Sequence, residues 1–188
     1  MERRRDRLLG RPAGLVTTPD RDTALKEFEA AQAAFVGAYA GVPDEALAFL
    51  KPGEDYALGG LVTHVVAVLE HYQLVLSAIL DAGFGEVRPE DPPGFWEQQG
   101  RRAHAGLQPD ERAAAFGELD RRHAGFAATV ASLPGEDWDR KAAVWFPSAA
   151  EALPTSPGDI WGWLNDHYLE HVGQVGDLHQ EWVISRTR

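Results

Sequence analysis

The stretch that decides the fold lies near the C-terminus and reads SPGDIWGWLNDHYLEHVGQVGDLH over residues 156–179. Its start is typical of a helix, because Ser156 suits the N-cap, Pro157 the first helical position, and Asp159 completes a capping box. At 100° per residue, one stripe of this helix faces the core. The stripe and its edge consist of Ile160, Leu164, His167, Tyr168, His171, Val175, Leu178 and Trp182.

Two histidines therefore point inward from this helix. His167 and His171 are four residues apart, so their rings lie about one turn apart on one face and can reach a single ion. A buried imidazole loses its hydration and needs a partner for each ring nitrogen. The spacing favours a shared metal ion. The alternative is a pair of core histidines that hydrogen-bond to carboxylates or to the backbone.

Composition limits the class of protein. The 188 residues, 44% hydrophobic and 25% charged, fit one globular domain over residues 21–188. Residues 1–20 are expected to form a disordered N-terminal arm. The arm is basic but no apolar segment follows it, so we expect a cytoplasmic protein. The net charge of −11 argues against binding to nucleic acid or to an anionic membrane.

Cysteine is absent from the sequence. The chain therefore has no disulfide framework, no thiolate nucleophile and no cysteine-based zinc site, and any metal must be held by histidines and carboxylates.

Apolar periodicity predicts three further long helices, over residues 22–39, 56–82 and 109–133, and a short one over residues 95–104. Four long helices favour an all-α, up-down four-helix bundle. Polar residues interrupt the apolar run of the second helix, which argues against a membrane span. Its apolar residues surround the whole helix, so we expect a second buried face, covered either by loops or by a partner in a homodimer.

The second helix offers two candidates for a third ligand. His64 and His71 are seven residues apart, about 10 Å along the axis, so only one of them can join the same ion. Antiparallel packing in a bundle lets His64 approach His167 and His171. Three neutral imidazoles leave one coordination position open, as in catalytic rather than structural zinc sites.

Other candidates receive simpler interpretations. We expect His104 and His123 at the surface and His179 beyond reach of the metal. The aromatic side chains between the third and fourth long helices either cover the metal or pack as a satellite of the core. They are Trp138, Trp145 and Phe146.

The segments THVVAVLEHY (63–72) and DHYLEHVGQV (166–175) resemble the DinB-like superfamily of metal-binding four-helix bundles, over residues 22–182. The resemblance implies that His64, His167 and His171 hold zinc, nickel or another divalent cation. It also implies activity on a small molecule. Some relatives are thiol-dependent S-transferases or isomerases that use a low-molecular-weight thiol as cosubstrate, and others are hydrolases.

The sequence therefore predicts a metal-dependent enzyme, with S-transfer from a low-molecular-weight thiol as the first reading. A hydrolase and a non-catalytic metal-binding or interaction module are the alternatives. Glu170 is the candidate catalytic base, and Asp166 is the other acid that could accept a proton or support a metal ligand. The alternative for both is a solvated acid on the helix surface. The residues from His167 to His171 also fit the inverted zinc-peptidase pattern H-x-x-E-H. That reading ranks lower, because only 17 residues follow His171 to supply a further ligand.

Overall fold

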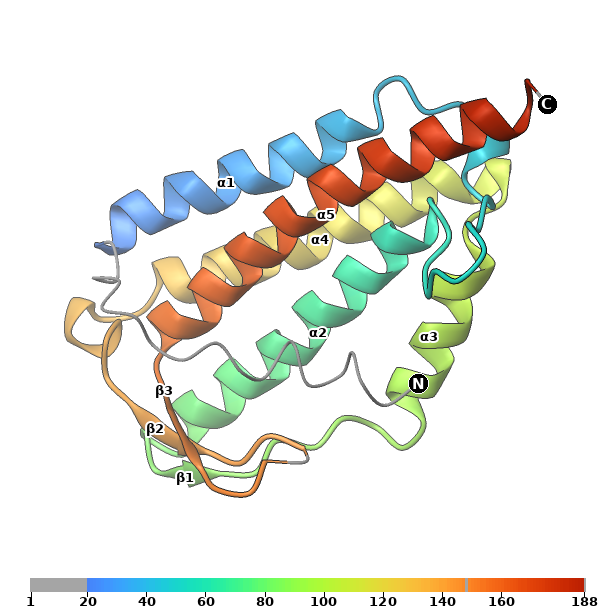
Figure 1. The fold of residues 1–188 in the computed structure, drawn as a ribbon. Coiled ribbons are helices and arrows are strands. Elements are labelled where there is room, and N and C mark those ends of the chain that lie inside the picture. The colour runs from blue at the N-terminus through green and yellow to red at the C-terminus, as the bar shows by residue number, and fades with distance from the viewer. Residues whose placement is uncertain (1–19, 148, 188) are drawn as a thin grey trace.

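Four long helices lie side by side and form the body of the molecule (Figure 1). The computed structural model describes residues 20–147 and 149–187. The predicted four-helix bundle is confirmed. The predicted N-terminal arm lies outside the described residues, apart from Asp20. The long helices are α1 (Arg21–Ala38), α2 (Gly60–Asp81), α4 (Arg112–Ala131) and α5 (Pro157–Ser185).

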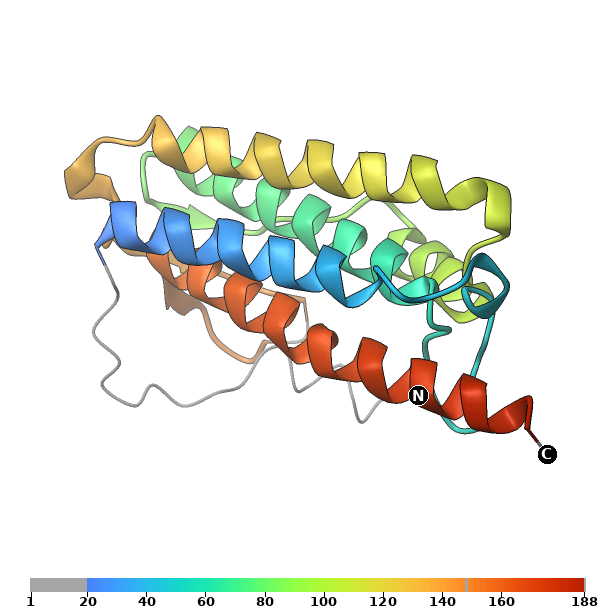
Figure 2. The ribbon, with the colours of Figure 1, turned by 90° about the horizontal axis from the view of Figure 1, so that it is seen from above.

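Two of the long helices run in each direction. α1 and α5 run one way, and α2 and α4 run the other way, in both views of the ribbon (Figures 1 and 2). α2 and α4 can run in the same direction because residues 82–111, which connect them, carry the chain back along the bundle. This return segment contains the predicted short helix, α3 (Phe95–Ala105). α5 is antiparallel to α2, as the convergence of their histidines requires.

The start of α5 has the capping geometry that the sequence predicts. The Ser156 hydroxyl accepts a hydrogen bond from the Asp159 N–H at 3.2 Å. The Asp159 carboxylate accepts one from the Ser156 N–H at 2.8 Å. The two bonds satisfy amide groups that a helix N-terminus leaves without intrahelical partners.

α2 begins at Gly60, four residues later than predicted. The Gly59 N–H donates to the carbonyl of Leu47 at 2.7 Å. A β-carbon at Gly60 would lie 1.7 Å from the carbonyl oxygen of Ala103 in α3. Glycine is therefore needed at both positions, because another backbone approaches closely there.

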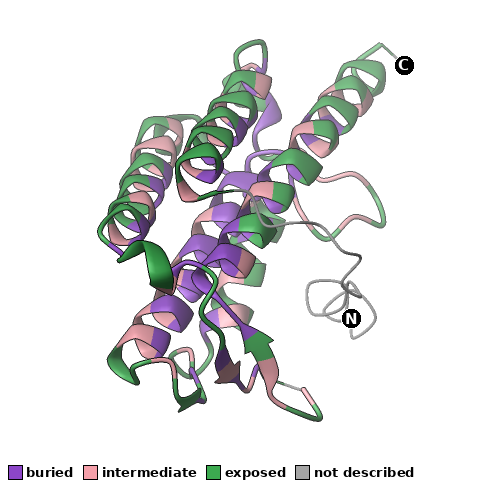
Figure 3. Cartoon of the chain, turned by 90° about the vertical axis from the view of Figure 1, so that its left-hand side faces the viewer, coloured by how far each residue is buried: buried purple, intermediate pink, exposed green. Residues whose placement is uncertain are grey.

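α2 is the central helix of the bundle, and buried residues mark the inward faces around it (Figure 3). Fourteen of its residues are buried, against α3, α4, α5 and the first strand. Within this chain, its extra apolar faces are thus covered by neighbouring helices and the return segment. By length and composition α2 could cross a membrane, but 67% of its most apolar window is buried in the bundle. That burial is expected of a core helix.

A small sheet closes one end of the bundle. It consists of β1 (Glu86–Val87), β2 (Ala142–Val144) and β3 (Leu153–Thr155). β1 pairs in parallel with β2, and β2 pairs antiparallel with β3. The sequence analysis did not predict these strands, because two or three residues are too few to show an alternating pattern.

Candidate metal centre

Three histidines from α2 and α5 converge inside the bundle. One ring nitrogen from each of His64, His167 and His171 lies within 4.8 Å of the others. The Nε2 atoms of His167 and His171 are 3.2 Å apart. The ring of His64 is centred 5.0 Å from that of His167 and 5.1 Å from that of His171. The structure thus brings together the residues that the sequence analysis selected.

All three rings are buried, with 7%, 6% and 4% of His64, His167 and His171 exposed. Burial, together with the nearby His171, lowers the pKa of His64 to about 3. Burial also holds the pKa of His167 well below its ordinary value, with the other two rings adding to the effect. The pKa of His171 is lowered by burial as well. The three rings are therefore neutral at pH 7, each with a lone pair to donate.

The donor set fits a divalent cation. Neutral imidazoles are good ligands for zinc and nickel, and three of them leave at least one coordination position for another ligand. The Nδ1–H of His171 donates to the Gln174 side-chain oxygen at 2.8 Å, which leaves Nε2 free to face the other rings. His167 Nδ1 is buried with no hydrogen-bond partner among the described residues. The ring of His167 must therefore be held in place by side-chain packing and by the partner of its Nε2.

Tyr56 also surrounds the three rings, and it was not predicted from the sequence. Its ring stacks on that of His64 with centroids 4.4 Å apart. It also meets the ring of His171 edge-on at 6.4 Å. Tyr56 precedes α2, so helical periodicity does not relate it to His64. It is half-buried, and its stacking fixes the orientation of the His64 ring.

Glu170 is exposed on α5, next to His171. Its negative charge favours the protonated form of His171 and so acts against the effect of burial on that pKa. The carboxylate is thus close enough to influence the centre. Its role as a catalytic base stays a prediction.

The remaining histidines lie outside the group of three. His104 is exposed, and His179 packs against Trp182 at 6.0 Å. His71 pairs with Asp91, whose carboxylate oxygens are 2.9 and 3.0 Å from Nδ1. The sequence analysis missed Asp91, because twenty residues and no regular period separate it from His71.

The prediction that His123 lies at the surface is wrong. Only 4% of the residue is exposed. Its ring stacks on Phe28 with centroids 4.3 Å apart. The charged neighbours in the sequence were misleading, since position 123 shares a helical face with the buried residues of α4. These are Leu119, Phe126 and Val130.

The aromatic residues before α5 pack against other parts of the bundle. Trp138 meets Trp161 of the core at 6.2 Å. Phe146 meets Trp163 at 6.0 Å, and the Arg88 guanidinium lies 4.1 Å from the ring centre of Trp145. These contacts favour the interpretation as a satellite of the core over that of a cover on the metal.

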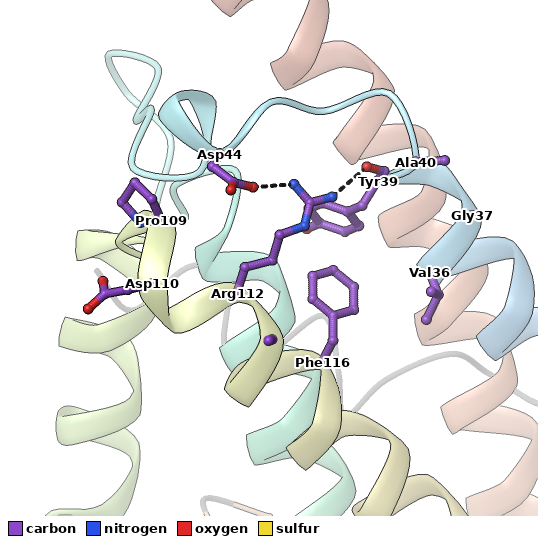
Figure 4. A pocket seen from close by; sticks show the side chains of 10 residues that line it. Val36, Gly37, Tyr39, Ala40, Asp44, Pro109, Asp110, Arg112 and Phe116 are labelled. Carbon is purple, nitrogen blue, oxygen red and sulfur yellow. Dashed lines mark hydrogen bonds and ion pairs between the residues drawn. The ribbon is translucent and has the colours of Figure 1, made fainter.

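A hollow of about 610 Å³ lies between the end of α1 and the start of α4 (Figure 4). Its central side chain is Arg112, which donates to the carbonyls of Val42 and Tyr39 at 2.7 and 2.8 Å. It also donates to the Asp44 carboxylate at 2.7 Å. None of the three clustered histidines lines this hollow. Arg112 serves here to join α1 to α4.

The fold and the histidine group together define a helical bundle with a candidate metal centre. A family model described as the DinB superfamily matches residues 27–175. The chain belongs to that superfamily. No curated protein sequence matches the chain significantly.

Solved structures share the fold at low sequence identity. YfiT from Bacillus subtilis superposes with a TM-score of 0.65 at 15% identity, over 89% of this chain and 92% of its own. That protein is described as a probable metal-dependent hydrolase with an unusual four-helix bundle topology. A protein from Streptococcus pneumoniae superposes with a TM-score of 0.62 at 12% identity, over 87% of this chain and 90% of its own.

Proposed function

We propose that the protein is a divalent-metal-dependent enzyme whose metal, zinc or nickel, is held by His64, His167 and His171. The observation that carries the proposal is the convergence of three buried, neutral imidazoles with no carboxylate among them. A cation bound there supplies a Lewis acid that lowers the pKa of an attacking nucleophile.

The protein's own residues then have defined tasks. Gln174 fixes the tautomer of His171, and Tyr56 fixes the ring plane of His64. Glu170 is the candidate proton acceptor, because it is the exposed carboxylate whose charge reaches His171. The apolar surroundings of the three rings limit the access of water.

Hydrolysis of a small molecule is the first candidate reaction. The description of YfiT supports it, since that protein has the same fold over nearly its whole length. S-transfer from a low-molecular-weight thiol is the second candidate. Three uncharged ligands leave the full positive charge of the cation in place, which suits an anionic thiolate as well as it suits hydroxide.

Metal analysis tests the site first. Wild type, His167→Ala and His123→Ala are purified in parallel, and their zinc and nickel contents are measured. Wild type and His123→Ala should carry about one ion per chain, and His167→Ala should carry almost none. His123→Ala is the matched control, because it removes an equally buried imidazole outside the site. Equal metal contents in wild type and His167→Ala would contradict the proposal.

Activity assays then separate the two reactions. The metal-loaded protein is given 4-nitrophenyl acetate alone, or a thiol together with 1-chloro-2,4-dinitrobenzene. The chain contains no cysteine, so any thiol chemistry must come from the added thiol. Metal-dependent turnover should appear in one arm and disappear in His167→Ala. Full metal occupancy without turnover in either arm would leave a non-catalytic metal-binding module.

A further inference from the structure

His71 lies on the face of α2 that carries His64 and has one ring nitrogen without a partner. The two residues are seven apart, so their side chains point in nearly the same direction, about 10 Å apart along the helix. Nδ1 of His71 faces both oxygens of Asp91 at 2.9 and 3.0 Å. When the ring is neutral, Nδ1 is therefore the nitrogen that carries the proton, and Nε2 carries the lone pair.

The pair is rigidly supported. Only 8% of the Asp91 side chain is exposed, and its carboxylate also accepts a hydrogen bond from the indole N–H of Trp96 at 2.7 Å. Two ring donors thus hold one buried carboxylate. A carboxylate on Nδ1 fixes the orientation of the ring and strengthens Nε2 as an acceptor.

Nε2 of His71 has no hydrogen-bond partner in the described part of the chain. About 10% of the His71 side chain stays exposed. Nε2 is therefore an oriented acceptor that a ligand can reach.

Two aromatic rings lie against the His71 ring. The ring of Trp96 is centred 5.3 Å from that of His71, and the ring of Tyr72 5.1 Å. Tyr72 in turn contacts Trp163 at 5.8 Å. Trp163 lies one turn before His167 on α5 and is 37% exposed. Tyr72 thus links the exposed indole of Trp163 to the ring of His71, and an indole offers a ligand a large apolar face.

We infer that His71, Trp96 and Trp163 form a subsite for a planar group that carries an O–H or N–H donor. The donor would bond to Nε2 of His71, and the indole rings would contact the face of the group. If the three-histidine centre works as proposed, this group is the distal part of the substrate, about two helical turns from the reacting part.

A purely structural role for the pair of His71 and Asp91 would explain fewer of these observations. Asp91 could simply tie residues 82–94 to α2 through Nδ1 of His71. That role requires neither a reachable Nε2 nor an exposed Trp163. His123 shows how a structural histidine looks in this protein: its Nδ1 lies 3.3 Å from the Tyr168 hydroxyl, and its Nε2 is fully buried 3.2 Å from the Glu29 carboxylate, where it forms no hydrogen bond and no ligand can reach it.

The test uses two probes that differ by one donor. Metal-free protein labelled with ¹⁵N-histidine is titrated with 4-methylphenol and with its methyl ether, 4-methylanisole, and the ring signals of His71 are followed by NMR. The phenol should bind about fivefold more tightly than the ether, the value of one hydrogen bond. His71→Phe should abolish this preference. His104→Phe, which replaces an exposed histidine, should keep it.

A second variant guards against a folding defect in His71→Phe. Trp163→Ala removes an exposed side chain and should weaken both probes about equally, because it takes away ring contact and leaves the acceptor. Equal affinity of wild type for phenol and ether would overturn the inference. So would a preference that persists in folded His71→Phe, or phenol-induced shifts confined to His64, His167 and His171.

Metal content is measured on the same proteins as purified, before the metal is removed for the titrations. A wild-type protein that prefers the phenol but binds no metal would refute the proposed function and leave the subsite standing. A protein that binds metal but shows no preference would refute the subsite alone.

Discussion

His123 and the three clustered histidines are about equally buried, yet their ring nitrogens meet different partners. His123 stacks on Phe28, and its Nδ1 lies 3.3 Å from the Tyr168 hydroxyl. Its Nε2 lies 3.2 Å from the Glu29 carboxylate, close enough for an ion pair when the ring is protonated. In the cluster, Nε2 of His167 faces Nε2 of His171.

The difference shows how a buried histidine signals a site. At His123 the protein itself places a carboxylate, that of Glu29, beside Nε2. In the cluster the described residues place no carboxylate on the converging nitrogens, which leaves their lone pairs available to a cation. Burial alone does not distinguish His123 from the three-histidine cluster. The chemistry of the partners does.

The largest expected effect is stabilisation by zinc. At about a thousand times its dissociation constant, zinc should raise the free energy of unfolding of wild type by about 4 kcal/mol. His64→Ala should lose this gain, and His123→Ala should keep it. Urea denaturation with and without zinc measures the difference. Equal responses of the two variants would erase the distinction between the regions.

Acid should destabilise the metal-free protein through the cluster. The folded pKa values of His64, His167 and His171 lie below the unfolded value, which is about 6.5. As the pH falls below that value, the unfolded chain takes up protons that the folded chain does not. Stability should therefore fall by about 1.4 kcal/mol per pH unit for each histidine.

Two variants show how much of this acid-induced loss of stability comes from the cluster and how much from His123. From pH 6.5 to 5, His64→Ala should lose about 2 kcal/mol less stability than wild type. His123→Ala should recover less, because the charge of Glu29 opposes the effect of burial on the His123 pKa. Denaturation curves at both pH values provide the measurement. A pH dependence unchanged in His64→Ala would show that its ring is not the source.

Loss of the Gln174 side chain should weaken zinc binding without abolishing it. Without its bond to Nδ1, His171 is no longer held in the tautomer that presents Nε2. Gln174→Ala should weaken zinc binding about tenfold. Gln32→Ala is the control, since the Gln32 amide bonds to Asp120 on the surface at 2.8 Å. Competition with a zinc chelator measures both, and a similar loss in the two variants would contradict the role of Gln174.

The smallest effect is expected at the carboxylate beside His123. Glu29 is 62% exposed, so Glu29→Gln should change the free energy of unfolding by less than about 1 kcal/mol. Zinc affinity should not change at all. A large loss of stability, seen by urea denaturation, would mean that the ion pair at His123 contributes more than its exposure suggests.

The sequence predicted those parts that depend on local pattern. Helical periodicity placed four long helices, capping residues located the start of α5, and a four-residue spacing paired His167 with His171. Bringing His64 to them required antiparallel packing, which helix lengths and the DinB-like resemblance both supported.

The rest depends on contacts between distant segments. Asp91 and Tyr56 come from irregular segments, whose conformation no period describes. β1 to β3 are too short to show a pattern. His123 could have been placed correctly, because the apolar face of α4 includes position 123, but charged neighbours were given more weight than the helical period.

The contact of Gly60 with Ala103 has a consequence for the surface around His71. Because the two backbones touch there, α3 cannot slide along α2 as an independent flap. Asp91, which precedes α3, and Trp96, in its first turn, are therefore set in place when the bundle itself assembles. Redesigning this protein for a different ligand would mean exchanging side chains while the backbones of α2 and α3 stay in place. Their close packing depends on the absence of a side chain at position 60.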